Sequence, residues 1–171
     1  MGEKGRWIFV VVAAVLASLA FICPAAAATA PTPENWAPLV AKIMMGLSLS
    51  LGLAGSAVGL ATAFSALLGG GAENFYKNIA VAMMPSSQGI YSIVVLFSNM
   101  DNFYSDPYTV AGRAAIFGVA MFFSAWFQGI VCAAGIRNIL DGKNTITNAL
   151  VSGAMPETYA VFALVMTFIM K

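Results

Sequence analysis

Residues 108–136 read YTVAGRAAIFGVAMFFSAWFQGIVCAAGI, and Arg113 is the only charged residue among them. The hydrocarbon core of a bilayer is about 30 Å thick and takes about 20 apolar helical residues to cross. This run is long and apolar enough to do so, and three similar runs lie at about residues 39–68, 75–97 and 146–170. The pattern predicts an all-α membrane protein with four transmembrane helices.

The composition agrees with this prediction and excludes several classes of function. The chain has 171 residues, of which 60% are hydrophobic and 9% charged, with a mean hydropathy of +0.86, whereas soluble domains have about 25% charged residues. A net charge of +1 argues against a nucleic-acid-binding surface. The chain has no histidine, which excludes His-based triads and zinc sites with histidine ligands. Cys23 and Cys132 have no CxxC partner, which argues against thiolate metal sites.

The connections between the runs indicate two tandem helical hairpins. Residues 69–74 and 137–143 are short links, so the spans pair as hairpins 39–98 and 108–171 within one four-helix unit, residues 31–171. The hairpins also resemble each other, since Met-Pro-Ser-Ser at 84–87 matches Met-Pro-Glu-Thr at 155–158. We interpret the unit as two copies of one transmembrane hairpin.

The N-terminal segment, residues 1–30, has the pattern of a secretory signal peptide. Lys4 and Arg6 precede the apolar run 7–22, and small residues follow it; an uncleaved extra transmembrane helix is the alternative. Residues 31–38 contain too many helix breakers for a helix interior and are predicted to form an external leader. A basic start kept in the cytoplasm would place both short hairpin links there as well.

Glu157 is the one charged residue in the middle of an apolar run, while every other charge lies near a segment end or in a loop. An acidic side chain at the centre of a spanning helix costs about 2.5–3.5 kcal/mol on insertion scales. Such a residue indicates a functional site. The alternative is a protonated, structural glutamate that is hydrogen-bonded to a neighbouring helix.

Polar residues on the other runs are candidate partners of Glu157. Ser87, Gln88 and Tyr91 lie in the second run and Gln128 in the third, and a rise of about 1.5 Å per residue puts Gln88, Gln128 and Glu157 at similar depths. Together they would form an all-oxygen cage for a hard monovalent cation. Alternatively, each glutamine forms an interhelical hydrogen bond of about 0.6–2 kcal/mol.

Prolines and small residues complete the pattern of the four runs. Pro85 and Pro156 lack the N–H group that would bond the carbonyls of Val81 and Ser152, so those carbonyls are predicted to be free. Runs one and three carry small residues at spacings that let helices approach closely: Gly52, Gly55, Ser56, Gly59, Gly118, Ser124, Gly129, Ala133, Ala134 and Gly135.

These residues give the chain a resemblance to the proteolipid (K or c) subunit of V-type and archaeal-type rotary ATPases. The resemblance covers about residues 40–170. Its most specific pieces are MPSSQGIY at 84–91, FQG at 127–129 with AAGI at 133–136, and ETYA at 157–160. It implies a prokaryotic plasma-membrane, multi-pass protein that assembles into a ring.

The family pattern also implies roles for individual residues. In that family the carboxylate of the last helix carries the transported ion, which corresponds to Glu157 here. Sodium-transporting members surround Na⁺ with a backbone carbonyl, a Thr-Gln pair and a further Gln, which correspond to the Met84 carbonyl, Ser87, Gln88 and Gln128. Tyr91 would hydrogen-bond the glutamate. Ser87 departs from the usual Thr but keeps the hydroxyl, and proton-transporting members usually lack the two glutamines.

The resemblance implies a mechanism and partners as well. Identical subunits would form a ring that turns against a membrane stator carrying a basic residue, and central-stalk subunits would couple the ring to ATP. The chain has no nucleotide-binding motif, so we expect it to be a non-catalytic subunit in the lipid bilayer, carrying Na⁺ or only H⁺. Two rivals remain: a stand-alone small four-helix ion transporter or channel, and a purely structural four-helix protein.

Overall fold

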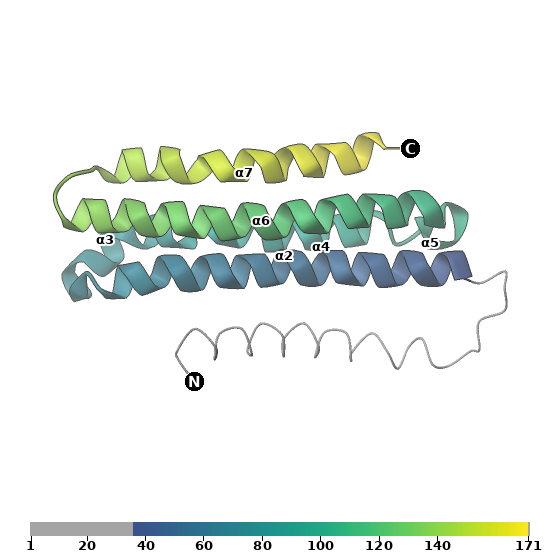
Figure 1. Ribbon diagram of the computed structural model, residues 1–171, viewed down its shortest axis with the longest axis horizontal. Helices are drawn as coiled ribbons and strands as arrows, with labels where there is room; N and C mark the ends of the chain where they lie inside the picture. Colours follow the sequence, from purple (N-terminus) through teal and green to yellow (C-terminus); the bar gives the residue numbers. More distant parts are fainter. Residues whose placement is uncertain (1–35, 171) are drawn as a thin grey trace.

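The computed structural model describes residues 36–170, and every regular element within this range is a helix. Four spans lie side by side (Figure 1): α2 (Trp36–Leu68), the succession α3 (Gly71–Met83), η2 (Met84–Ser86) and α4 (Ser87–Ser98), α6 (Pro107–Leu140) and α7 (Ile146–Ile169). All four are long and apolar enough to cross a membrane. The prediction of four membrane-spanning helices is therefore confirmed.

The start of the first span corrects one prediction. We expected an external leader up to residue 38, but α2 begins at Trp36 and includes Pro38 in its first turn. Proline is tolerated there because the first N–H groups of a helix have no intrahelical partner. The predicted signal segment, residues 1–30, lies outside the residues that the structure describes.

The links between the spans differ in length from the predicted ones. Helix α3 begins at Gly71, whose φ of 75° suits glycine, so the first link is shorter than predicted. Helix α6 continues past Arg137 to Leu140. The loop between the hairpins contains a further short helix, α5 (Asn102–Ser105). Both short links lie at one end of the bundle, opposite α5 (Figure 1).

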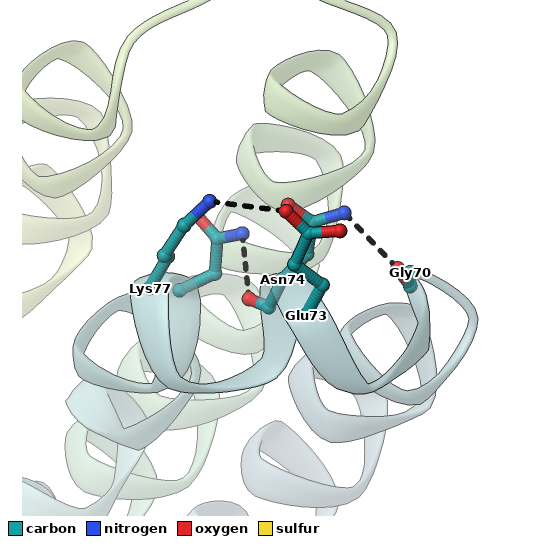
Figure 2. Close-up of polar contacts among 5 residues, drawn as sticks. Gly70, Glu73, Asn74 and Lys77 are labelled. Atoms are coloured by element: carbon teal, nitrogen blue, oxygen red, sulfur yellow. Dashed lines mark hydrogen bonds and ion pairs between the residues drawn. The ribbon is translucent and has the colours of Figure 1, made fainter.

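Polar side chains gather where α3 begins (Figure 2). Lys77 Nζ lies 3.8 Å from Glu73 Oε1, and Nδ2 of Asn74 donates a 3.2 Å hydrogen bond to the carbonyl of Gly70. Both charged side chains are exposed, so this ion pair adds little stability. Asn78, one turn further along, is buried and donates from Nδ2 to the carbonyl of Asn74.

The closest packing joins α2 and α6, the two helices predicted to approach through small residues. A Cβ atom added to Gly129 would lie 2.4 Å from the Cα of Gly59, and one added to Gly55 would lie 2.7 Å from the Cα of Phe122. Backbone atoms cannot yield as flexible side chains can, so the glycines are needed for this approach. The predicted close packing of these two helices is confirmed.

Arg113 ties three segments together at the end of the bundle opposite the short links. Its Nη1 donates a 2.8 Å hydrogen bond to Oδ1 of Asn99, which follows α4, and its Nη2 donates to the carbonyl of Met170, which follows α7. Like Arg113, the other charged residues within 36–170 lie towards the ends of the spans or in the links, with Glu157 as the exception.

Candidate functional site

Glu157 lies near the middle of α7, one residue after Pro156. Its side chain is half-buried, whereas Gln88 and Gln128 are fully buried. The half-burial follows from the position of α7, which the rest of the chain covers least among the four spans. Glu157 is thus partly covered by the other helices.

Both carboxylate oxygens of Glu157 accept hydrogen bonds from other helices. Tyr91 on α4 donates from its hydroxyl to Oε1 at 2.9 Å, and Gln128 on α6 donates from Nε2 to Oε2 at 3.2 Å. Hydrogen bonds to an ionised acceptor are about twice as strong as neutral ones. They offset part of the cost of placing a carboxylate inside an apolar helix bundle.

A chain of polar contacts continues from Gln128 into α4. Nε2 of Gln88 donates to Oε1 of Gln128 at 2.6 Å. On the other side of Gln88, the Ser87 hydroxyl lies 3.3 Å from Oε1 of Gln88 and 3.3 Å from the carbonyl oxygen of Met84, so its single proton can go to either. The structure therefore brings together in one network all six residues that the sequence singled out.

Two details differ from the sequence-based expectation. The carbonyl of Val81 is not free, because the N–H of Met84 donates to it as the chain turns into η2. A tighter 3₁₀ turn shifts the bonding by one residue and so compensates for the N–H that Pro85 lacks. The second difference concerns Gln128, whose amide nitrogen, and not its oxygen, faces Glu157.

Three members of the network were missed by sequence reasoning. Ser124, which was interpreted as a packing residue, accepts from Nε2 of Gln88 at 3.3 Å and donates to the carbonyl of Pro156 at 2.7 Å. The carbonyl of Gly153 accepts from Nε2 of Gln128 at 3.0 Å. The signal for Ser124 was available, because it precedes Gln128 by one helical turn on the same face. Backbone carbonyls leave no such signal in a sequence.

An open groove of about 480 Å³ lies beside the network, between α6 and α7. Its lining is mostly apolar and aromatic, and it includes Ser124 and Pro156 of the network: Ala120, Phe123, Ser124, Phe127, Val131, Ser152, Met155, Pro156 and Tyr159. The polar network is therefore bordered by an apolar outer surface.

The chemistry of the network restricts its use. Within residues 36–170 no three His, Cys, Asp or Glu side chains gather in a metal-binding group, and transition metals prefer imidazole or thiolate ligands. Hard cations instead prefer oxygen ligands. The network contains such oxygen atoms in one carboxylate, two amides, a hydroxyl and a backbone carbonyl. A proton can also bind Glu157 directly.

Comparison with known proteins shows the family. The family model for the C subunit of ATP synthase matches residues 111–170. The chain is 30% identical to the V-type sodium ATPase subunit K of Enterococcus hirae over 145 residues, which cover 80% of this chain and 93% of that protein. The chain belongs to the proteolipid subunits of rotary ATPases. The resemblance seen in the sequence is confirmed.

A second relative broadens the family match of this proteolipid. The A-type ATP synthase subunit K of Methanocaldococcus jannaschii is 32% identical over 134 residues, covering 74% of this chain and 61% of that protein. With its four spans, this proteolipid is an integral, multi-pass membrane protein. The two rival interpretations, a stand-alone transporter and a structural protein, are not favoured, because both relatives are subunits of rotary ATPases.

Proposed function

We propose that this proteolipid is a rotor-ring subunit that carries Na⁺ across the membrane by reversible binding at Glu157. The observation that supports this most is the connected network that runs from the Met84 carbonyl through Ser87, Gln88 and Gln128 to Glu157. Proton binding alone would require the carboxylate but neither buried amide. The Enterococcus relative, named as part of a sodium ATPase, supports the same ion.

Sodium binding would rearrange part of this network. Glu157, the Oε1 of Gln88 and the Met84 carbonyl can supply oxygen ligands without turning a donor group away, and the Ser87 hydroxyl has only to direct its proton away from the cation. Gln128 presents Nε2 to Glu157, and an N–H group repels a cation. Its amide must therefore turn to supply Oε1, giving up the hydrogen bonds to Gln88 and Gly153. Tyr91 would continue to hold the carboxylate.

Rotation would follow from the charge of the site. While Glu157 faces lipid, its cation neutralises it, because a bare carboxylate there is costly. Opposite a stator protein with a basic residue, the carboxylate would release Na⁺ to an aqueous path. Moving one charge across 100 mV costs about 2.3 kcal/mol. One such carboxylate in two tandem hairpins, 39–98 and 108–171, lowers the ions carried per ATP, which favours a pump over a synthase.

The proposed partners are further copies of this chain in a ring, the stator, and central-stalk proteins that couple the ring to ATP hydrolysis elsewhere in the complex. Large apolar side chains exposed on α6 and α7, among them Phe127, Tyr159 and Phe162, are suited to contact lipid or a neighbouring copy. Sodium and protons compete for one carboxylate, so selectivity is a ratio of two affinities.

The test is ATP-driven ²²Na⁺ uptake into membrane vesicles that contain the whole ATPase. Glu157→Gln removes the charge but keeps the shape of the side chain. Glu73→Gln is the matched control, because Glu73 is an exposed glutamate at the end of the bundle. Ring assembly is measured in parallel by the size of the detergent-extracted complex.

We expect Glu157→Gln to abolish uptake while the ring still forms, and Glu73→Gln to leave uptake unchanged. Uptake by Glu157→Gln at the wild-type rate would remove Glu157 from the mechanism. Uptake of protons but not of ²²Na⁺ by the wild-type complex would make this a proton carrier and reduce the glutamines to interhelical hydrogen bonds.

A further inference from the structure

Ser124 occupies a position in the network that a packing role does not explain. It lies on α6, is only 6% exposed, and its hydroxyl contacts two other helices. It accepts from Nε2 of Gln88 on α4 at 3.3 Å and donates to the carbonyl of Pro156 on α7 at 2.7 Å. A serine that only filled space between helices would not need both contacts.

The direction of these bonds is fixed by chemistry. A backbone carbonyl can only accept, so the Pro156 carbonyl takes the single proton of Ser124. The Ser124 oxygen can then only accept, which requires a donor from Gln88. The amide nitrogen of Gln88 must therefore point to Ser124 and Gln128, and its oxygen must point to Ser87.

This orientation matters at a cation site. An amide turned by 180° would present its NH₂ group where Oε1 now faces Ser87, replacing an oxygen ligand with a donor that repels a cation. The contact with Gln128 cannot hold this orientation once sodium is bound, because the amide of Gln128 then has to turn and gives up its hydrogen bonds to Gln88 and Gly153. Ser124, whose proton is committed to a backbone carbonyl, has no such freedom.

We propose that Ser124 is a positioning residue that orients the amide of Gln88 and so raises the sodium affinity of the site. The proposal rests on the proposed function, because it concerns sodium binding at Glu157. Ser124 does not itself touch the ion in this proposal. Loss of Ser124 should therefore lower the sodium affinity without abolishing sodium binding. It should change the protonation of Glu157 less than it changes the sodium affinity.

The test is the sodium concentration that half-protects Glu157 from labelling by dicyclohexylcarbodiimide in the detergent-extracted full-length protein. Ser124→Ala is compared with the wild type and with Ser92→Ala. Ser92 is a matched control, because it is also a buried serine on the bundle interior but its hydroxyl donates, within residues 36–170, only to the carbonyl of Gln88 in its own helix. The pH profile of labelling without sodium is recorded for each variant.

We expect Ser124→Ala to raise the half-protecting sodium concentration roughly three- to tenfold, as the loss of one buried hydrogen bond predicts, and to shift the sodium-free pH profile less. Ser124→Thr, which keeps the hydroxyl, should restore the wild-type value, and Ser92→Ala should retain it. Ser124→Cys is similar in size to the wild type but is only a weak donor, so it should raise the half-protecting sodium concentration as Ser124→Ala does. It replaces the alanine variant if that variant folds poorly.

Equal half-protecting concentrations for wild type, Ser124→Ala and Ser124→Cys would overturn the role of Ser124 and leave the proposed function standing. An equal loss in Ser92→Ala would also overturn it, because any buried serine would then have the same effect. A wild-type protein that sodium does not protect at all would overturn the proposed function and the role of Ser124 with it.

Discussion

Oε1 of Gln128 accepts a 2.6 Å hydrogen bond from Nε2 of Gln88. The amide oxygen that the family pattern assigns to the ion is thus bonded to a neighbouring side chain, while the amide nitrogen faces Glu157. The structure therefore holds an arrangement in which the two glutamines bond to each other and to the carboxylate. Under the proposed function, sodium binding would exchange these bonds for ion contacts.

Replacing either glutamine tests whether this exchange occurs. We expect Gln128→Ala or Gln88→Ala to raise the sodium concentration needed for half-maximal ATPase activity about tenfold or more. Each variant loses an amide oxygen that would bind the ion, together with the hydrogen bonds of that amide to its neighbours. The measurement is sodium-dependent ATP hydrolysis by the whole complex. Asn78→Ala is the control, since Asn78 is a buried amide outside the network. Unchanged sodium dependence in both glutamine variants would reduce the glutamines to interhelical hydrogen bonds.

The contact between Tyr91 and Glu157 gives a second prediction. Tyr91→Phe keeps the ring but removes the 2.9 Å hydrogen bond to Oε1 of Glu157. Hydrogen bonds to charged groups contribute about 1.5–3 kcal/mol, and the protonated carboxyl loses less than the carboxylate. We expect the labelling of Glu157 by carbodiimide to persist to higher pH in this variant. Tyr76→Phe, at an exposed tyrosine, should not change the profile, and an unchanged profile for Tyr91→Phe would contradict the prediction.

The approach of α2 to α6 gives a third prediction, about stability. A Cβ atom at position 129 would meet the backbone of Gly59 at 2.4 Å, so Gly129→Ala should destabilise the bundle by about 1–3 kcal/mol, the usual cost of overpacking. The measurement is thermal unfolding in detergent, followed by circular dichroism. Gly112→Ala is the control on the same helix, because a Cβ there meets no atom of the described residues within 4 Å. Equal melting temperatures for the two variants would show that the helices separate without cost.

The sequence predicted the fold to the extent that hydrophobic patterning determines it. Lipid offers no hydrogen-bond partners, so a spanning segment has to satisfy its backbone groups internally, as a helix does. A long apolar run therefore identifies a membrane-spanning helix. The start of α2 was predicted wrongly because Pro38 breaks a helix interior but not a first turn. The end of α6 was missed because Arg137 is polar, although a helix can continue beyond the apolar part of its sequence.

Six members of the candidate site were predictable from the sequence, but Ser124, the two backbone carbonyls and the hydrogen bonding were not. Glu157 is conspicuous as the charge within an apolar run, and Gln88 and Gln128 follow from depth and from the family pattern. The directions of the amides depend on which groups can only accept, and these include the carbonyls of Gly153 and Pro156. Their positions come from the packing of α6 against α7, which one sequence does not report.

The most direct test of sodium binding at Glu157 is carbodiimide labelling of the extracted wild-type protein, with and without sodium, across pH. Carbodiimides modify protonated carboxyls in apolar surroundings, so Glu157 should be the labelled residue, and labelling should fall as pH rises. We predict that millimolar sodium protects Glu157, and that more sodium is needed as pH falls, because protons and Na⁺ compete for one carboxylate. Labelling of Glu157 that depends on pH but ignores sodium would contradict the account.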